Sequence, residues 1–171
     1  MIEFISTHLD DNHNTSEFQC GNLALDDWLR RQALRAQRAG ISRVTIWSPA
    51  SSEKQVAAYY SISPAQVVAS DGLPRKATGG FSYIPAWLIG KLAVDIQFQG
   101  QGIGRDILFD AIETIISAAR IGGGRVIIVD PIDERAARWY QQLGFSPFSL
   151  GEEPRRQFLL MTKAEASFGG I

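Results

Sequence analysis

The strongest chemical signal in the sequence is a glycine-rich turn, Gln99-Gly100-Gln101-Gly102-Ile103-Gly104-Arg105. Glycines in such a turn let backbone N–H groups face outward without obstruction from a Cβ atom. If a helix starts there, its N-terminus adds unpaired donors and partial positive charge, and Arg105 adds a charged donor. The turn therefore favours a phosphate or pyrophosphate ligand, although the same residues also fit a tight turn with helix-cap glycines.

Two widespread phosphate-binding motifs do not fit this chain. A Walker A loop around Gly90-Lys91 would need glycine at position 85 and serine or threonine at position 92, where the chain has Pro85 and Leu92. A G-x-G-x-x-G motif starting at Gly100 would need glycine at position 105, where the chain has arginine. The turn is therefore a phosphate-binding candidate of another kind.

Apolar periodicity predicts the elements that position this turn. The apolar run Ala86–Val94 predicts a strand before it, and helical spacing over Ile103–Ala119 predicts a helix after it. Residues 69–83 are expected to form a flexible loop. Interleaved helices and strands predict one α/β or α+β sheet covered by helices. Further strands are predicted at Ile2–Ser6, Arg43–Ser48, Gln55–Ser63, Arg125–Val129 and Gln157–Thr162. A further helix is predicted over Leu23–Arg38, and another follows the N-cap residue Asp133 and ends at Gln142.

The composition limits the class of protein. A length of 171 residues predicts a single domain over 1–171. The one cysteine, Cys20, excludes an internal disulfide and suits a reducing compartment. His8 and His13 form no recognisable ligand set with Cys20, so no metal is expected. The apolar runs are too short to cross a bilayer and the first residues lack the basic charge of a signal peptide, so we expect a soluble, cytoplasmic protein.

Two segments of the chain resemble the GCN5-related N-acetyltransferases (GNAT). The acetyl-CoA signature of that family is Gln/Arg-x-x-Gly-x-Gly/Ala, and Gln99, Gly102 and Gly104 fill it after a Leu-Ala-Val-Asp stretch. Downstream, Ala137–Phe145 resembles the family segment A-x-x-[FW]-Y-x-x-x-G-F. The resemblance implies the GNAT fold, a mixed and mostly antiparallel sheet flanked by helices, with one strand splayed at the acetyl-CoA site.

The resemblance also implies which residues hold the co-substrate, acetyl-CoA. The main chain of the strand before the turn would contact pantetheine, and the turn would hold the pyrophosphate. The residues implied are Leu92, Ala93, Val94, Gln99, Gly100, Gln101, Gly102, Ile103, Gly104 and Arg105.

A narrower resemblance covers the N-terminal half. Phe18–Leu29 is similar to the F-x-C-G-x-x-x-L-D-x-[WF]-L stretch of GNAT toxins from bacterial toxin–antitoxin pairs. Val56–Ser61 is similar to their V-x-G-Y-Y-x-L strand, with Ala58 in place of glycine. The resemblance implies a toxin that acetylates the free amino group of aminoacyl-tRNA and stops translation. It also implies a homodimer and a ribbon-helix-helix antitoxin as partner.

Tyr140 is the candidate catalytic acid. Acetyl transfer to an amine needs an unprotonated amine, a stabilised oxyanion and a proton for the leaving thiolate. The phenol of Tyr140, with an ordinary pKa of about 10, is protonated at neutral pH, and the family resemblance places it beside the thioester and makes the Val94 N–H an oxyanion donor. Packing of the helix is the alternative role for this side chain.

No general base stands out, since neither Glu113 nor Glu134 has a partner that marks it. An α-amino group, with a pKa of about 7.7–8.0, is partly neutral at pH 7, whereas a lysine side chain, with a pKa of about 10.4, depends more on a base to remove its proton. The missing base therefore favours an α-amine acceptor mildly.

A strip of basic residues lies along the predicted first helix. Arginine side chains bind phosphate oxygens bidentately, so the strip predicts contact with the tRNA backbone, in a chain whose net charge is only −1. A solvated helix face or an acidic antitoxin segment are the alternatives. The residues predicted to bind tRNA are Arg30, Arg31, Arg35, Arg38, Arg75 and Lys76, with Arg43 and Arg155-Arg156 as extensions.

The sequence thus leaves three hypotheses. The favoured one is an acetyl-CoA-dependent toxin acting on aminoacyl-tRNA. The second is a GNAT enzyme acting on a small amine or a protein N-terminus, and the third is a non-catalytic CoA-binding module that does not need Tyr140.

Overall fold

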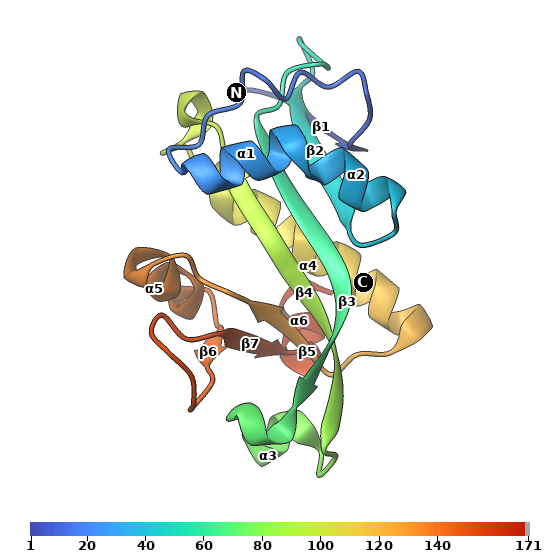
Figure 1. Cartoon of the computed structure of the whole chain (residues 1–171), viewed down its shortest axis with the longest axis vertical. Helices are drawn as coiled ribbons and strands as arrows, with labels where there is room; N and C mark the ends of the chain where they lie inside the picture. Colours follow the sequence, from blue (N-terminus) through green and yellow to red (C-terminus); the bar gives the residue numbers. More distant parts are fainter. Residues whose placement is uncertain (170–171) are drawn as a thin grey trace. The chain divides into compact units, whose positions relative to one another are not determined.

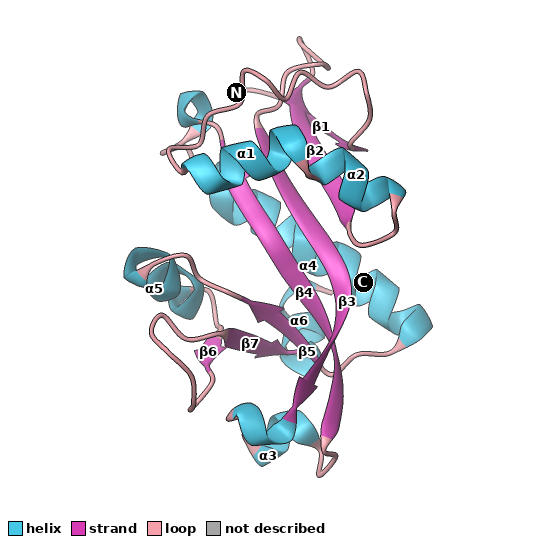
Figure 2. Cartoon of the chain, in the orientation of Figure 1, coloured by secondary structure: helices cyan, strands magenta, loops and turns pink. Residues whose placement is uncertain are grey.

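The computed structural model, which describes residues 1–169, is an α+β structure with a mixed sheet flanked by helices (Figures 1 and 2). The strands of the described chain are β1 (Phe4–His8), β2 (Arg43–Pro49), β3 (Ala58–Val68), β4 (Tyr83–Val94), β5 (Val126–Val129), β6 (Ser146–Pro147) and β7 (Gln157–Leu160). The helices are α1 (Leu23–Arg31), α2 (Ala33–Arg38), α3 (Arg75–Thr78), α4 (Ile103–Gly122), α5 (Glu134–Gln142) and α6 (Met161–Phe168), with 3₁₀ turns η1 (Ala69–Asp71) and η2 (Ile96–Phe98).

The strands are ordered β1-β2-β3-β4-β5-β7-β6. β4 and β5 are parallel, whereas β1–β2, β2–β3, β5–β7 and β6–β7 are antiparallel. The predicted mixed, mostly antiparallel sheet is therefore confirmed. The register of β4 with β5 ends at Ile89↔Val129, so residues 90–94 of β4 lie beyond it. This is the end of β4 that leads into the glycine-rich turn.

The chain divides into two compact units, and β3, β4 and α4 run through both. The first unit holds residues 1–63 and 91–111, and the second holds residues 64–90 and the chain from 112 onward. The single domain expected from the length stays a prediction.

The core of the first unit lies between helices α1 and α2 and strands β2 and β3. An apolar stripe at helical spacing, Leu25, Leu29, Ala33 and Ala36, runs along α1 and α2. Its middle residues, Leu29 and Ala33, are buried in one cluster with Val44 and Ile46. Tyr59 is fully buried among them, and its hydroxyl donates a hydrogen bond of 2.7 Å to the Leu25 carbonyl. Burial of this apolar face fixes α1 and α2 on the sheet.

The core of the second unit is built on β4, β5 and β7. Every residue of β5 is buried, and side chains alternate between two faces. Val126 and Ile128 join an apolar cluster with Phe148 and Phe158. On the other face, the buried Gln157 amide donates to the Ala137 carbonyl of α5 at 3.0 Å. Figure 2 shows α3 at the end of the β3–β4 hairpin.

Several local predictions differ from the structure. The single helix predicted over 23–38 is two helices that meet at Gln32, where φ is −116° instead of the roughly −63° of a regular helix. The loop predicted over 69–83 contains η1 and α3, because Pro74 starts a short helix that Gly79 ends. The short strand β6 and helix α6 were not predicted, and β7 ends at Leu160.

Candidate active site

The glycine-rich turn joins β4 to α4, as predicted, and its backbone donors are unpaired. Within residues 1–169, none of the N–H groups of residues 99–105 donates to another residue, and the first bond of α4 runs from the Asp106 N–H to the Gly102 carbonyl at 3.2 Å. Consecutive free N–H groups at a helix N-terminus form a site for an anion. The turn therefore offers what a pyrophosphate requires.

Gly100 and Gly102 shape this turn. Their φ values are 77° and 84°, in the left-handed region that favours glycine. A Cβ atom placed on either glycine would meet nothing within 4 Å, so both face open space. The glycines therefore serve the backbone conformation, and they leave room for a ligand above the N–H groups.

The segment before α1 braces the turn from the first unit. Asp95, which directly follows β4, is buried, and its carboxylate accepts hydrogen bonds from the N–H groups of Gln19 (3.0 Å) and Gln97 (2.9 Å). The Gln19 carbonyl accepts in turn from the Ile96 N–H at 2.8 Å. Asp95 was not predicted as a site residue. The signal that could have identified it is its position between an apolar strand and the glycine-rich turn.

Gln99 has a role that the motif alone did not reveal. Its side-chain amide donates to the carbonyls of Cys20 and Val94, both at 2.8 Å. These bonds occupy the amide nitrogen and tie the turn to the end of β4. Only the backbone N–H of Gln99 is then available for a pyrophosphate, and its contact with the donor stays a prediction.

The other predicted donor residues are placed as follows. Ala93 is buried in the core of the first unit, and Leu92 and Val94 are half-buried, so their side chains contribute to packing. Ile103 is buried and anchors the start of α4. Arg105 is exposed, with its guanidinium 5.1 Å from the centre of the Phe109 ring.

Tyr140 lies on α5 in the second unit. Asp133 caps this helix as predicted, with its carboxylate accepting from the Ala136 N–H at 2.8 Å. The ring of Tyr140 is buried between Trp139 and Phe145, with centroids 5.0 and 5.5 Å away. After the helix, Gly144 takes a φ of 103°, which returns Phe145 to this ring.

The hydroxyl of Tyr140 remains without a hydrogen-bond partner within residues 1–169. Burial raises the pKa of this phenol above its ordinary value, and the charge of Asp130 raises it further. The hydroxyl therefore keeps its proton at neutral pH and can donate it to a ligand.

Comparisons with known proteins agree with this arrangement. The pattern of the family described as "Acetyltransferase (GNAT) domain" matches residues 50–147. The "tRNA-acetylating toxin" of Mycobacterium tuberculosis is 31% identical over 163 residues, which cover 94% of each chain. This chain belongs to the GNAT family.

Solved structures place the chain within the toxins of this family. The structure of the toxin AtaT in complex with acetyl-methionyl-tRNAfMet has a TM-score of 0.87 at 28% identity and covers 97% of this chain and 99% of AtaT. A Tyr-to-Phe variant of AtaT bound to acetyl-CoA and the C-terminus of the antitoxin AtaR has a TM-score of 0.81 at 27% identity, with 98% and 99% covered. The chain is thus a GNAT N-acetyltransferase of the toxin group.

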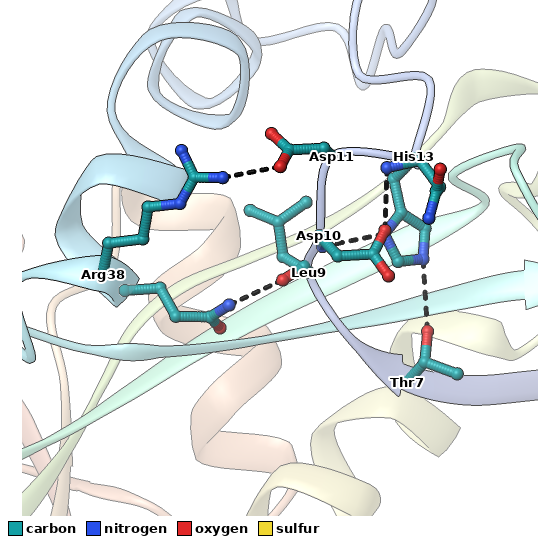
Figure 3. Close-up of polar contacts among 8 residues, drawn as sticks. Thr7, Leu9, Asp10, Asp11, His13 and Arg38 are labelled. Atoms are coloured by element: carbon teal, nitrogen blue, oxygen red, sulfur yellow. Dashed lines mark hydrogen bonds and ion pairs between the residues drawn. The ribbon is translucent and has the colours of Figure 1, made fainter.

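The basic residues of this GNAT toxin fall into two sets. The Arg30 guanidinium donates to the Phe18 carbonyl at 2.8 Å and lies 3.5 Å from the Asp27 carboxylate, so its contacts are made within the protein. Figure 3 shows Arg38 paired with Asp11, at 2.6 Å, beside the contacts of His13. Of the residues predicted to bind tRNA, those that are exposed and have no acidic partner among residues 1–169 are Arg31, Arg35, Arg43, Arg75 and Lys76.

The C-terminal arginines suggested as extensions of the strip are both engaged. Arg155 pairs with Glu153 at 2.9 Å, and Arg156 pairs with Asp130 at 2.7 Å. No helix in the described part of this GNAT toxin is long and apolar enough to cross a membrane. Residues 1–169 contain no cluster of three or more metal-ligating side chains.

Proposed function

We propose that this protein transfers the acetyl group of acetyl-CoA to the α-amino group of aminoacyl-tRNA and thereby blocks translation. The observation that carries the proposal is the run of unpaired N–H groups over residues 99–105, in a chain whose relatives include a tRNA-acetylating toxin. The complex of AtaT with acetyl-methionyl-tRNAfMet supports the choice of acceptor. An acetylated α-amine cannot form a peptide bond, which accounts for the block.

The donor is held by the first unit. The N–H groups of residues 99–105 bind its pyrophosphate, and Arg105 adds a charged contact. The main chain of residues 92–94 binds the pantetheine, and the Val94 N–H donates to the oxyanion that forms during transfer. Residues 90–94 of β4 lie beyond the register with β5, which favours this role.

Tyr140 provides the proton. The neutral amine attacks the acyl carbon, the C–S bond breaks, and the Tyr140 hydroxyl donates to the departing sulfur. Its unpartnered hydroxyl and its raised pKa support this role, because the phenol arrives at the reaction with its proton in place. The nitrogen that has bonded to the acyl carbon loses a proton to water, and water returns a proton to the phenol.

Contact with tRNA is assigned first to Arg31 and Arg35. They are exposed on α1 and α2 without an ion pair, whereas Arg30 and Arg38 are already bound within the fold. Arg75 and Lys76 on α3 are free to add further phosphate contacts.

The biological setting follows from the same group of toxins. We propose a cytoplasmic homodimer that is neutralised by an antitoxin of the ribbon-helix-helix type. The AtaT complex with the C-terminus of AtaR supports an antitoxin partner. Cys20 is a free, half-buried thiol, which suits a reducing compartment.

The test is a thiol-release assay with acetyl-CoA and charged tRNA, compared with free amines and N-terminal peptides. We expect release with charged tRNA and a loss of at least ~100-fold in kcat for Tyr140→Phe, since a positioned acid contributes about 10²–10⁴. Tyr83→Phe, at an exposed tyrosine of the same unit, is the control and stays at the wild-type rate. Release with free amines but not with charged tRNA would identify the enzyme as an acetyltransferase of small amines or protein N-termini.

A further inference from the structure

Gln157 is a buried amide in the apolar core of the second unit. It is the first residue of β7, and only 1% of its surface is exposed. The residues that follow it along the strand, Phe158 and Leu159, are buried and apolar. A buried polar group costs free energy unless hydrogen bonds replace its contacts with water. An apolar residue would therefore be the ordinary choice at this position.

The hydrogen bonds of this amide are incomplete. The nitrogen of Gln157 donates to the Ala137 carbonyl of α5 at 3.0 Å, which identifies this end of the amide as the donor. The oxygen, Oε1, is buried and has no hydrogen-bond partner among residues 1–169. A single hydrogen bond contributes less to stability than an unpaired buried polar atom costs. Gln157 is thus less favourable for folding than an apolar side chain of similar size.

The Ala137 carbonyl does not depend on this bond for a partner. Ala137 lies in the middle of α5, where each carbonyl already accepts a hydrogen bond from the N–H four residues later. The bond from Gln157 is a second one to the same oxygen. It adds a contact of defined length and direction between the sheet and the helix, whereas apolar burial is non-directional. The amide therefore specifies where α5 lies on β7.

This contact is about one helical turn from Tyr140. Ala137 and Tyr140 are both buried and, three residues apart, share one face of α5. The end of the helix meets the same strand, since a Cβ placed on Gly144 would lie 3.8 Å from the Leu159 side chain. Gln157 and Leu159 point to one face of β7, because side chains alternate along a strand. Tyr140 is therefore held between two points at which α5 meets β7.

We propose that Gln157 is a positioning residue for the acid, and that its bond to the Ala137 carbonyl sets α5 so that the Tyr140 hydroxyl is directed at the sulfur of the donor. This inference rests on the proposed function, because it takes Tyr140 as the proton donor. The hydroxyl has no hydrogen-bond partner within residues 1–169 that would orient it. Its direction is set by the helix that carries it, and a small displacement of a reacting group lowers the rate strongly.

The test is a double-mutant cycle between Gln157 and Tyr140. Gln157→Met replaces the amide by an apolar side chain of similar length, and Tyr140→Phe removes the acid. Initial rates with acetyl-CoA and charged tRNA give kcat and KM, calorimetry gives acetyl-CoA affinity, and urea denaturation gives stability.

We expect Gln157→Met to lose roughly tenfold in kcat, with KM and acetyl-CoA affinity within about twofold of the wild type. Its urea midpoint is expected to be no lower than that of the wild type, because the unpaired oxygen is removed together with the hydrogen bond. In the Tyr140→Phe background the same substitution is expected to change kcat by less than about twofold, because the group that it positions is absent.

Trp87→Phe is the matched control. The Trp87 indole donates to the Gly123 carbonyl at 2.9 Å, so this variant also removes one hydrogen bond between a side chain and the backbone of the second unit. Neither residue lies on α5, and we expect the wild-type kcat. A loss as large as that of Gln157→Met would overturn the inference, because the effect would then not depend on α5.

The outcomes separate this inference from the proposed function. If Tyr140→Phe lowers kcat and Gln157→Met does not, the inference alone is overturned. An equal loss from Gln157→Met with and without the Tyr140 hydroxyl also overturns it, because the amide would then act on another group. If wild-type protein binds acetyl-CoA but leaves charged tRNA unmodified, or if Tyr140→Phe keeps the wild-type kcat, the proposed function or its acid fails and the inference falls with it.

A second variant covers the case in which Gln157→Met does not fold. Gln157→Leu, which is also apolar, then takes its place in the cycle, with the same expected result. Unfolding of both variants would overturn the inference, because the amide would then serve the fold as a whole.

Discussion

Substitution of Gly100 or Gly102 by alanine separates donor binding from folding. Both residues have positive φ, and an added methyl group meets no neighbour within 4 Å, so the cost to the fold is backbone strain alone. A Cβ in the left-handed region costs roughly 1–2 kcal/mol. We therefore expect each variant to lose about 1–2 kcal/mol of unfolding free energy, or about 2–8 °C in Tm for a chain of this length.

Gly40 provides the matched control in the same unit. It follows α2 with a φ of 72°, and a Cβ there also meets nothing within 4 Å. Gly40→Ala therefore carries the same strain at a distance in sequence from the turn. Since the methyl groups at 100 and 102 enter the space above the free N–H groups, we expect these two variants to lose at least ~tenfold in acetyl-CoA affinity, about 1.4 kcal/mol. Gly40→Ala keeps wild-type affinity.

The assay is calorimetric titration of acetyl-CoA into each variant at a temperature well below the lowered Tm, with urea denaturation in parallel. Equal stability losses in all three variants with lost affinity only at positions 100 and 102 would support the turn as the donor site. Equal affinity in all three would refute the assignment, because the strain would then be the only effect of the methyl groups.

Two further predictions test the surface and the thiol. The double variant Arg31→Ala with Arg35→Ala is expected to reduce the slope of log K against log salt for tRNA binding by about 1.4–1.8, because each phosphate contact contributes ~0.7–0.9. Filter-binding titrations at several salt concentrations measure this slope. Arg38→Ala is the control and leaves the slope unchanged, because the Arg38 side chain is already paired with Asp11. Burial, and after it the hydrogen bond to Asp26, raises the pKa of the Cys20 thiol to about 11. Because this pKa lies above that of the unfolded chain, the stabilisation is full below about pH 8.5 and is lost as the pH rises toward 11. Alkylation of the thiol at pH 8 is expected to be slow until urea unfolds the chain. Urea midpoints from pH 7 to 10.5, compared with Cys20→Ser, measure the first effect, and a midpoint that rises with pH would contradict it.

The sequence predicted the elements around the site better than the contacts within it. Helix α4 and the capped helix α5 follow from apolar spacing and from Asp133, and both are confirmed. The break at Gln32 was missed because the apolar stripe continues through it. Helix α6 was missed because it directly follows β7 without a turn residue to separate them.

Within the site, what depends on local backbone was predictable and what depends on tertiary contact was not. The positive φ of Gly100 and Gly102 follows from their residue type in a strand–turn–helix context. The hydrogen bond from Gln157 to Ala137 depends on the packing of α5 on β7, which brings together residues 20 positions apart. The same holds for Asp95 and Gln19, whose contact joins the turn to a segment 76 residues earlier.

The toxin-like stretch Phe18–Leu29 has a structural role that connects both halves of the first unit. The Cys20 N–H donates to the buried Asp26 carboxylate of α1 at 2.9 Å, and the Cys20 carbonyl accepts from Gln99 in the glycine-rich turn at 2.8 Å. One residue thus joins the helix that begins the basic strip to the turn that offers the anion site. Each hydrogen bond contributes about 0.5–1.5 kcal/mol, so together with the Asp95 contacts they fix the turn against α1. The stretch that resembles the toxins therefore has a physical role in this chain, which is to brace the glycine-rich turn.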